Sequence, residues 1–153
     1  MELCIFVGLQ GSGKSTFFQT YFAATHIYIS KDVIRRSKTL NKDAKQAKLL
    51  EEALQQGLSV VVDNTNPTRE NRQALITLGH YYGATVLGYF FQSSIRESLR
   101  RNSERVGKAR VPDKAIYITS KRLVVPTLEE GFNTLYCVRI EENDRFLVNE
   151  CTL

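Results

Sequence analysis

Short apolar runs alternate with segments whose apolar residues recur every three or four positions. Residues 3–7, LCIFV, form a run typical of a strand that is buried on both faces of a sheet. From Lys14 the pattern becomes helical, with aromatic residues at positions 17, 18, 21 and 22. Further along, the pattern predicts strands at 26–30, 58–63 and 84–91, and helices at 31–37, 42–56, 66–82, 94–105 and 113–124. Asn66 and Pro67 are expected as the N-cap and first residue of the helix at 66–82.

Strands that alternate with helices of this length predict right-handed crossovers and a parallel sheet covered by helices on both faces. Two late strands, near 135–140 and 145–148, are expected to pair as a hairpin at one end of the sheet. The basic, glycine-containing segment 106–112 is expected to be a loop. We therefore expect an α/β fold of three layers, formed as one domain over residues 1–153.

The composition narrows the class of protein. At 153 residues, 42% hydrophobic and 24% charged, the chain has the size and composition of one globular domain. No apolar stretch is long enough for a membrane span, and the first residues lack the pattern of a signal peptide. The spacings of Cys4, Cys137 and Cys151 match no zinc or redox motif, which predicts three reduced thiols in a cytoplasmic protein. His26 and His80 are too few and too far apart to indicate a metal site.

The segment Gly8–Ser15, GLQGSGKS, fits the phosphate-loop pattern of a glycine, four residues and then Gly-Lys-Ser/Thr. Glycines let backbone N–H groups point at phosphate oxygens, and the helix that begins at Lys14 adds the positive end of its dipole. Lys14 is expected to reach the β and γ phosphates of ATP, and the Ser15 hydroxyl to bind Mg²⁺. The candidate ATP-binding residues of this loop are Gly11, Ser12, Gly13, Lys14, Ser15 and Thr16.

Three polar residues follow predicted strands at the edge where a ligand would bind. Asp63 ends the strand at 58–63 and is expected to hold Mg²⁺ through water. Asp32 follows the strand at 26–30 and is placed to accept the proton of an acceptor hydroxyl. Arg35, one helical turn later, could grip a phosphate of the acceptor. Each also has an ordinary structural interpretation, as a strand cap, a helix N-terminal carboxylate or a surface arginine.

A phosphate loop serves ATPases, GTPases, motors and kinases alike. The guanine-specifying Asn-Lys-x-Asp motif is missing, since Asn41-Lys42-Asp43 is one residue too short, and coupled ATPases need a longer chain. A small kinase remains, and it needs a cationic lid over the transferring phosphoryl group. Arg101 and Arg105 lie four residues apart on one helical face just before the basic loop. They are the candidate lid residues, although such a charged run is often only a solvated helix face.

Several stretches together resemble the 5′-hydroxyl polynucleotide kinases of nucleic-acid end healing. They are GLQGSGKST, SKDVIRR, VVVDNTNPTRENR, RNSERVGKARVPDKAIYITSKR and PTLEEGF, and their order matches that of the family. The resemblance covers roughly residues 3 to 140. The resemblance implies a P-loop kinase fold with a small lid at about 101–112, and C-terminal strands at about 134–150. It also implies ATP- and Mg²⁺-dependent transfer of a phosphoryl group to the 5′-hydroxyl end of RNA or DNA.

The resemblance assigns roles residue by residue. Asp32 aligns with the general base, Arg35 with the arginine that grips the acceptor's 3′-phosphate, and Arg105 with the lid arginine, assisted by Arg101. The family often has Asn-Arg-Asp where this chain has Ser30-Lys31-Asp32, so the charge is kept but the forked geometry of the guanidinium is lost. The phosphatase or ligase domain that often accompanies such kinases is not expected here, and a separate ligase or phosphatase would be a functional partner.

Other functions stay open at this point. Related kinases phosphorylate small molecules such as gluconate, adenylylsulfate or nucleotide sugars, and the net charge of +5 favours a polyanion only weakly. A non-catalytic ATP-binding module or switch is a different class of protein, and Asp32 argues against it because a pure binder has no use for a base. Membership of a larger repair assembly is compatible with either class.

Overall fold

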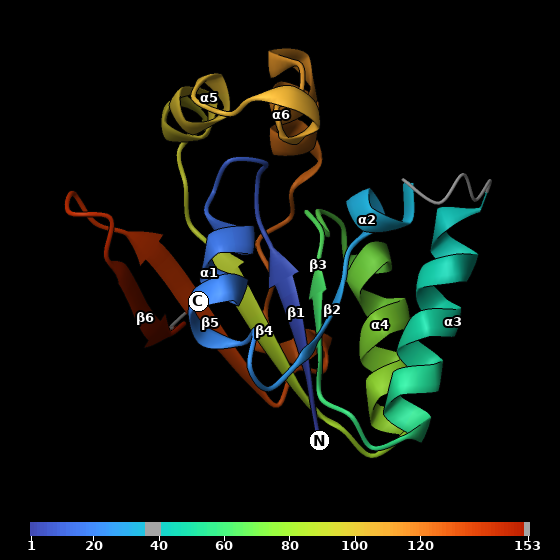
Figure 1. Cartoon of the computed structure of the whole chain (residues 1–153). Helices are drawn as coiled ribbons and strands as arrows, with labels where there is room; N and C mark the ends of the chain where they lie inside the picture. The colour runs from blue at the N-terminus through green and yellow to red at the C-terminus, as the bar shows by residue number, and fades with distance from the viewer. Residues whose placement is uncertain (36–40, 152–153) are drawn as a thin grey trace.

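The computed structural model describes residues 1–151 except 36–40, and it contains one six-stranded sheet (Figure 1). The strand order is β2-β3-β1-β4-β5-β6, in which the first five strands are parallel and β6 runs antiparallel to β5. The strands are β1 (Glu2–Val7), β2 (Ile27–Ile29), β3 (Val60–Asp63), β4 (Thr85–Phe91), β5 (Thr134–Ile140) and β6 (Phe146–Glu150). This confirms the predicted α/β fold with a mostly parallel central sheet and a C-terminal hairpin.

Helices cover both faces of the sheet and project beyond one end of it. They are α1 (Lys14–Tyr21), α2 (Lys31–Arg35), α3 (Lys42–Gln55), α4 (Arg69–Tyr81), α5 (Ile95–Ser103) and α6 (Asp113–Arg122), with 3₁₀ turns at Gly107–Ala109 and Leu128–Glu130. Helix α1 lies on one face, and α3 and α4 lie on the other (Figure 1). Helices α5 and α6 stand above the carboxyl ends of the parallel strands (Figure 1). Residues 95–122 are called the arm below.

Strand β1 is the centre of the core because its side chains alternate between the two faces. Leu3, Ile5 and Val7 pack with α3 and α4, whereas Cys4 and Phe6 pack with the aromatic residues of α1. The ring of Phe6 contacts four other aromatic rings, those of Phe17, Phe22, Tyr89 and Phe91. Burial on both faces explains why residues 3–7 read as a continuous apolar run. It also fixes the end of β1, and hence the start of the phosphate loop.

The start of α4 differs from the predicted N-cap at Asn66. Asn66 has a left-handed backbone (φ 43°), and its side-chain amide donates to the carbonyl oxygen of Phe6 at 2.8 Å. The helix instead begins at Arg69, with Thr68 as the N-cap in a capping box with Asn71. The polar side chain of Asn66 therefore ties the loop after β3 to the end of β1 and does not cap a helix.

The expectation of three reduced thiols was wrong for two of them. Cys137 and Cys151 form a disulfide, and Cys4 is free and buried. The bond is possible because β6 returns antiparallel beside β5 and places Cys151, which follows β6, next to the middle of β5. That pairing is tertiary, so the separation of 14 residues does not reveal it. In the described part of the chain, no helix is long and apolar enough to cross a membrane.

Candidate active site

The loop between β1 and α1 requires glycine at two positions. Gly11 and Gly13 have left-handed backbones, with φ of 77° and 95°. Space at Gly11 is also tight, since a Cβ there would lie 2.6 Å from the carbonyl oxygen of Ser98 in α5. Glycine therefore permits both the turn of the loop and the close approach of the arm.

The ammonium group of Lys14 is buried against this loop. It donates to the carbonyl oxygens of Gly8 at 3.2 Å and Leu9 at 2.7 Å. Burial lowers the pKa of Lys14 to about 8, and the nearby carboxylate of Asp63 opposes that shift. Lys14 is also the first residue of α1, so its charge and the N–H groups of the helix N-terminus lie together. This arrangement suits the binding of a phosphate group.

Ser15 and Asp63 meet as predicted, and Tyr28 joins them. The hydroxyls of Ser15 (2.9 Å) and Tyr28 (2.6 Å) both donate to Oδ2 of Asp63. Among the described residues none donates to Oδ1, which leaves that oxygen for a cation or its waters. Burial and the Asp63 charge raise the pKa of Tyr28, so this phenol stays a donor. A hydroxyl and a carboxylate are the hard oxygen ligands that Mg²⁺ prefers, and the residues present therefore fit that ion.

Asp32 lies in the first turn of α2, and the loop after β3 holds this helix in place. Asn64 accepts the backbone N–H of Lys31 at 2.8 Å and donates to the side chain of Gln46 in α3 at 2.6 Å. A 2.6 Å ion pair between Lys31 and Asp43 adds a second link to α3. Asp32 itself is exposed to the cleft described below. Asn64 therefore positions the helix that carries the predicted base.

The arm brings cations over the same end of the sheet. Asn102 is buried and binds both backbone groups of Val111, at 2.7 and 3.0 Å, so it clamps the loop 106–111 onto α5. Arg105 donates to the carbonyl oxygen of Ala109 at 3.3 Å within that loop. On α6, Thr119 accepts the side-chain amide of Gln10 at 3.0 Å, which ties the arm to the phosphate loop.

These elements enclose a cleft of about 640 Å³. It is lined by seven of the residues predicted from the sequence: Gly11, Lys14, Ser15, Thr16, Asp32, Asp63 and Arg105. Ser12 and Gly13 belong to the same loop but do not line the cleft. The side chain of Arg35 lies outside the described residues. Tyr28 and Asn64 also line the cleft and were not predicted, and Lys108 of the predicted basic loop lines it as well.

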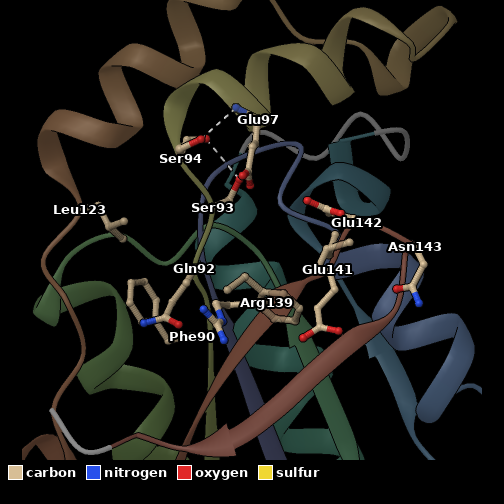
Figure 2. Close-up of a pocket in the computed structure, with 12 residues that line it drawn as sticks. Phe90, Gln92, Ser93, Ser94, Glu97, Leu123, Arg139, Glu141, Glu142 and Asn143 are labelled. Atoms are coloured by element: carbon tan, nitrogen blue, oxygen red, sulfur yellow. Dashed lines mark hydrogen bonds between the residues drawn. The ribbon is translucent and has the colours of Figure 1, made fainter.

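A second, larger hollow of about 920 Å³ lies between the start of α5 and the β5–β6 hairpin (Figure 2). Figure 2 shows Ser94, the N-cap of α5, and Glu97 of α5 above it, with Arg139, Glu141 and Glu142 of the hairpin across from them. Arg101 pairs with Glu97 at 3.9 Å, and it does not line the first cleft. With three carboxylates against one guanidinium, the second hollow disfavours a polyanion.

A buried ion pair supports the loop after β3, and the sequence did not predict this pair. Arg72 is fully buried, binds both carboxylate oxygens of Glu130 at 2.7 and 3.0 Å, and donates to the carbonyl oxygen of Asn66 at 3.0 Å. Thr65, the residue before Asn66, accepts the backbone N–H of Gly8 on its carbonyl oxygen at 3.0 Å. The DNTNPTRENR and PTLEEGF motifs are therefore joined, and together they hold the phosphate loop.

The sequence model of one protein family, described as an AAA domain, matches residues 3–123. The chain belongs to this family of P-loop proteins. It is 31% identical over 138 residues to a bifunctional polynucleotide phosphatase/kinase of Schizosaccharomyces pombe, a match that covers 88% of this chain. The chain spans about a third (32%) of the length of that relative.

Two solved structures have similar folds. One is the Pnkp1/Rnl/Hen1 RNA repair complex (TM-score 0.67, 25% identity), where the match covers 80% of this chain and 43% of the other. The other is a gluconokinase from Sinorhizobium meliloti 1021 (TM-score 0.65, 20% identity), with 92% and 83% covered. The comparisons confirm the resemblance to P-loop polynucleotide kinases and the P-loop kinase fold.

Proposed function

We propose that this P-loop protein transfers the γ-phosphoryl group of ATP to the 5′-hydroxyl end of RNA or DNA. The observation that carries the proposal is the lining of the 640 Å³ cleft. A phosphate loop with Lys14, an oxygen pair for a cation, a carboxylate on a separate helix and an arm arginine all face one space. These are the parts that phosphoryl transfer to a hydroxyl needs.

The roles follow from the position of each group. Lys14 and the loop N–H groups hold the phosphates, and Asp32 accepts the proton of the attacking 5′-hydroxyl. Arg105 neutralises charge on the γ-phosphoryl oxygens in the transition state. Ser15 and Asp63 would hold Mg²⁺, Asp63 through water, and the ion would supply positive charge to the β and γ phosphates. Tyr28 and Ser15 fix the direction of the Asp63 carboxylate by their hydrogen bonds to Oδ2. The roles of Arg101 in assisting ATP binding and of Arg35 in gripping an acceptor phosphate are proposed from the resemblance alone, since Arg101 does not line the cleft.

The similarity to the S. pombe enzyme and to the repair complex supports a polynucleotide acceptor. The charge of the arm supports it too, because residues 95–122 contain nine Lys or Arg and three Asp or Glu. A separate ligase or phosphatase is the proposed functional partner, and a cytoplasmic location stays a prediction. The match to the gluconokinase covers 83% of that chain. It makes a small hydroxylated metabolite the second candidate acceptor.

Transfer of labelled γ-phosphate from ATP to short 5′-hydroxyl RNA and DNA oligonucleotides tests the proposal. The same oligonucleotides with a 5′-phosphate are the matched control, and Lys14→Ala is the enzyme blank. We expect label on the 5′-hydroxyl strands alone, and none with the blank. Label transferred to gluconate but to neither oligonucleotide would instead support the metabolite kinase.

A further inference from the structure

Three side chains with metal-binding chemistry gather at the amino end of the sheet, far from the cleft. Glu2 and Cys4 lie two residues apart on β1 and so face the same side, and His26 reaches them from the turn after α1. Their ligand atoms all lie within 4.8 Å of one another. Cys4 is roughly 13 Å from Gly8 along β1 at about 3.3 Å per residue, so this cluster is separate from the phosphate loop.

The imidazole of His26 gives an independent sign of a missing ligand. Its side chain is only 9% exposed, and its Nε2 is buried without a hydrogen-bond partner among the described residues. That nitrogen lies 3.8 Å from the Glu2 carboxylate, beyond hydrogen-bond distance. An unpaired buried nitrogen is costly, and a cation beside it would remove that cost.

The hydrogen bonds of Thr25 favour one ring nitrogen of His26 as the cation ligand. Thr25 Oγ1 lies 3.5 Å from the carbonyl oxygen of Phe22, to which it donates, and 2.7 Å from Nδ1 of His26. With the Thr25 hydroxyl donating to Phe22, its oxygen accepts the Nδ1 proton, and the tautomer of His26 that fits this arrangement has its lone pair on Nε2. Metal-binding histidines are typically oriented by such a bond from their other nitrogen.

We infer that Glu2, Cys4 and His26 form a binding site for a zinc-like divalent cation. One thiolate, one imidazole and one carboxylate are ligands that Zn²⁺ accepts, and a thiolate disfavours Mg²⁺. Tetrahedral zinc bonds of about 2.0 to 2.3 Å put neighbouring ligand atoms about 3.4 to 3.6 Å apart. The cluster reaches that spacing by movements of about 1 Å, and the side chain of Glu2, 40% exposed, has room to move.

The thiol proton must leave when the cation binds. Burial, together with the Glu2 carboxylate, raises the pKa of Cys4 in the protein alone, so this residue is then a protonated thiol. A divalent cation reverses that preference because its charge stabilises the thiolate. Binding therefore releases the Cys4 proton to solvent and forms the bond between sulfur and metal. The histidine count alone did not predict this site, because two of its ligands are not histidines.

The cysteines of this chain allow a direct test. A Cys137→Ser/Cys151→Ser variant without an affinity tag has Cys4 as its single thiol. Titration of this variant with Co²⁺ should give a thiolate-to-metal charge-transfer absorption that saturates at one equivalent and disappears when Zn²⁺ is added. The oxygen ligands at Ser15 and Asp63 cannot produce that absorption. Its absence at millimolar Co²⁺, in protein that retains its circular dichroism spectrum, overturns the proposal.

The two histidines supply a matched pair of variants in the same background. His26→Gln should raise the Co²⁺ dissociation constant at least about tenfold, as expected for loss of one ligand. His80→Gln should leave it unchanged, since His80 lies on α4 and contacts the carbonyl oxygen of Gly131. Equal Co²⁺ affinity in the His26→Gln variant and its parent would show that the three residues do not form one site. Neither experiment depends on kinase activity, so the outcome is independent of the proposed function.

Discussion

The arm and the rest of the chain use charged residues in opposite ways. The 28 residues of the arm carry nine Lys or Arg and three Asp or Glu, a net charge of +6, whereas the other 125 residues carry twelve and thirteen, a net charge of −1. Outside the arm, Arg72 and Glu130 are buried and paired. In the arm, Arg100 and Glu104 form an exposed pair. The buried pair of the sheet region therefore fixes loops in place, and we propose that the arm presents its charge to a ligand.

The buried pair should matter most for stability. Arg72→Ala leaves Glu130 buried without its partner and frees the loop that supports Gly8, so we expect the free energy of unfolding to fall by about 3–5 kcal/mol. Urea denaturation measures the change. Arg100→Ala breaks the exposed pair and should cost no more than about 1 kcal/mol. Equal losses of unfolding free energy in the two variants would contradict the difference proposed between the arm and the sheet region.

Arg105 should matter for transfer and not for stability. Arg105→Ala removes the guanidinium from the cleft, so we expect kcat to fall about 10²- to 10³-fold, as for other groups that stabilise transition-state charge. Steady-state transfer to a 5′-hydroxyl oligonucleotide measures this loss. Arg100→Ala, an exposed neighbour on α5, is the control. Similar kcat values for the two variants would mean that the arm only attracts substrate.

The pKa of Lys14 predicts how ATP binding depends on pH. With a pKa of about 8, Lys14 is charged at pH 7 and becomes neutral above pH 8 in the free protein. The triphosphate stabilises the charged form and raises this pKa, so binding takes up a proton above pH 8. ATP affinity should then be flat from pH 7 to 8 and fall by up to about tenfold per pH unit above it. A Lys14→Arg variant, whose side chain does not titrate, should show no such fall.

The exposed cations of the arm should have the smallest effect, and it should depend on salt. Replacing Arg110, Lys114 and Lys121 by glutamine should weaken oligonucleotide binding. It should also lower the slope of log affinity against log salt by about 0.7 per lost phosphate contact. The matched control replaces Lys48, Arg69 and Arg145, which are exposed outside the arm. If the two triple variants reduce the slope equally, the arm is not the binding surface.

The sequence was sufficient to predict the features that depend on local residue patterns. The period of the apolar residues located the strands and helices, and the GLQGSGKS spacing located Lys14 and Ser15 in the cleft. Partners distant in the chain were not predictable this way. Arg72 and Glu130 are 58 positions apart, and nothing near Arg72 indicates that it is buried. Tyr28 looked like an ordinary strand residue, and its bond to Asp63 exists because β2 lies beside β3.

The cysteines and Asn66 illustrate the same limit. The Cys137–Cys151 bond depends on the antiparallel return of β6, and the backbone of Asn66 is set by its bond to Phe6 in β1. In both cases a tertiary contact outweighs the local preference that the sequence displays. The sequence therefore gives the elements and the motifs, and the packing of β1 against its neighbours decides how they meet.

The assignment of Asp32 as the base is tested most directly by Asp32→Asn. Single-turnover transfer from bound ATP to a 5′-hydroxyl RNA should slow by about 10²- to 10⁴-fold, because the amide cannot accept the hydroxyl proton. The ATP dissociation constant should stay within about twofold, since Asp32 lies on α2 and not in the phosphate loop. Transfer at the rate of the unmodified protein, with ATP bound as tightly, would contradict the role assigned to Asp32.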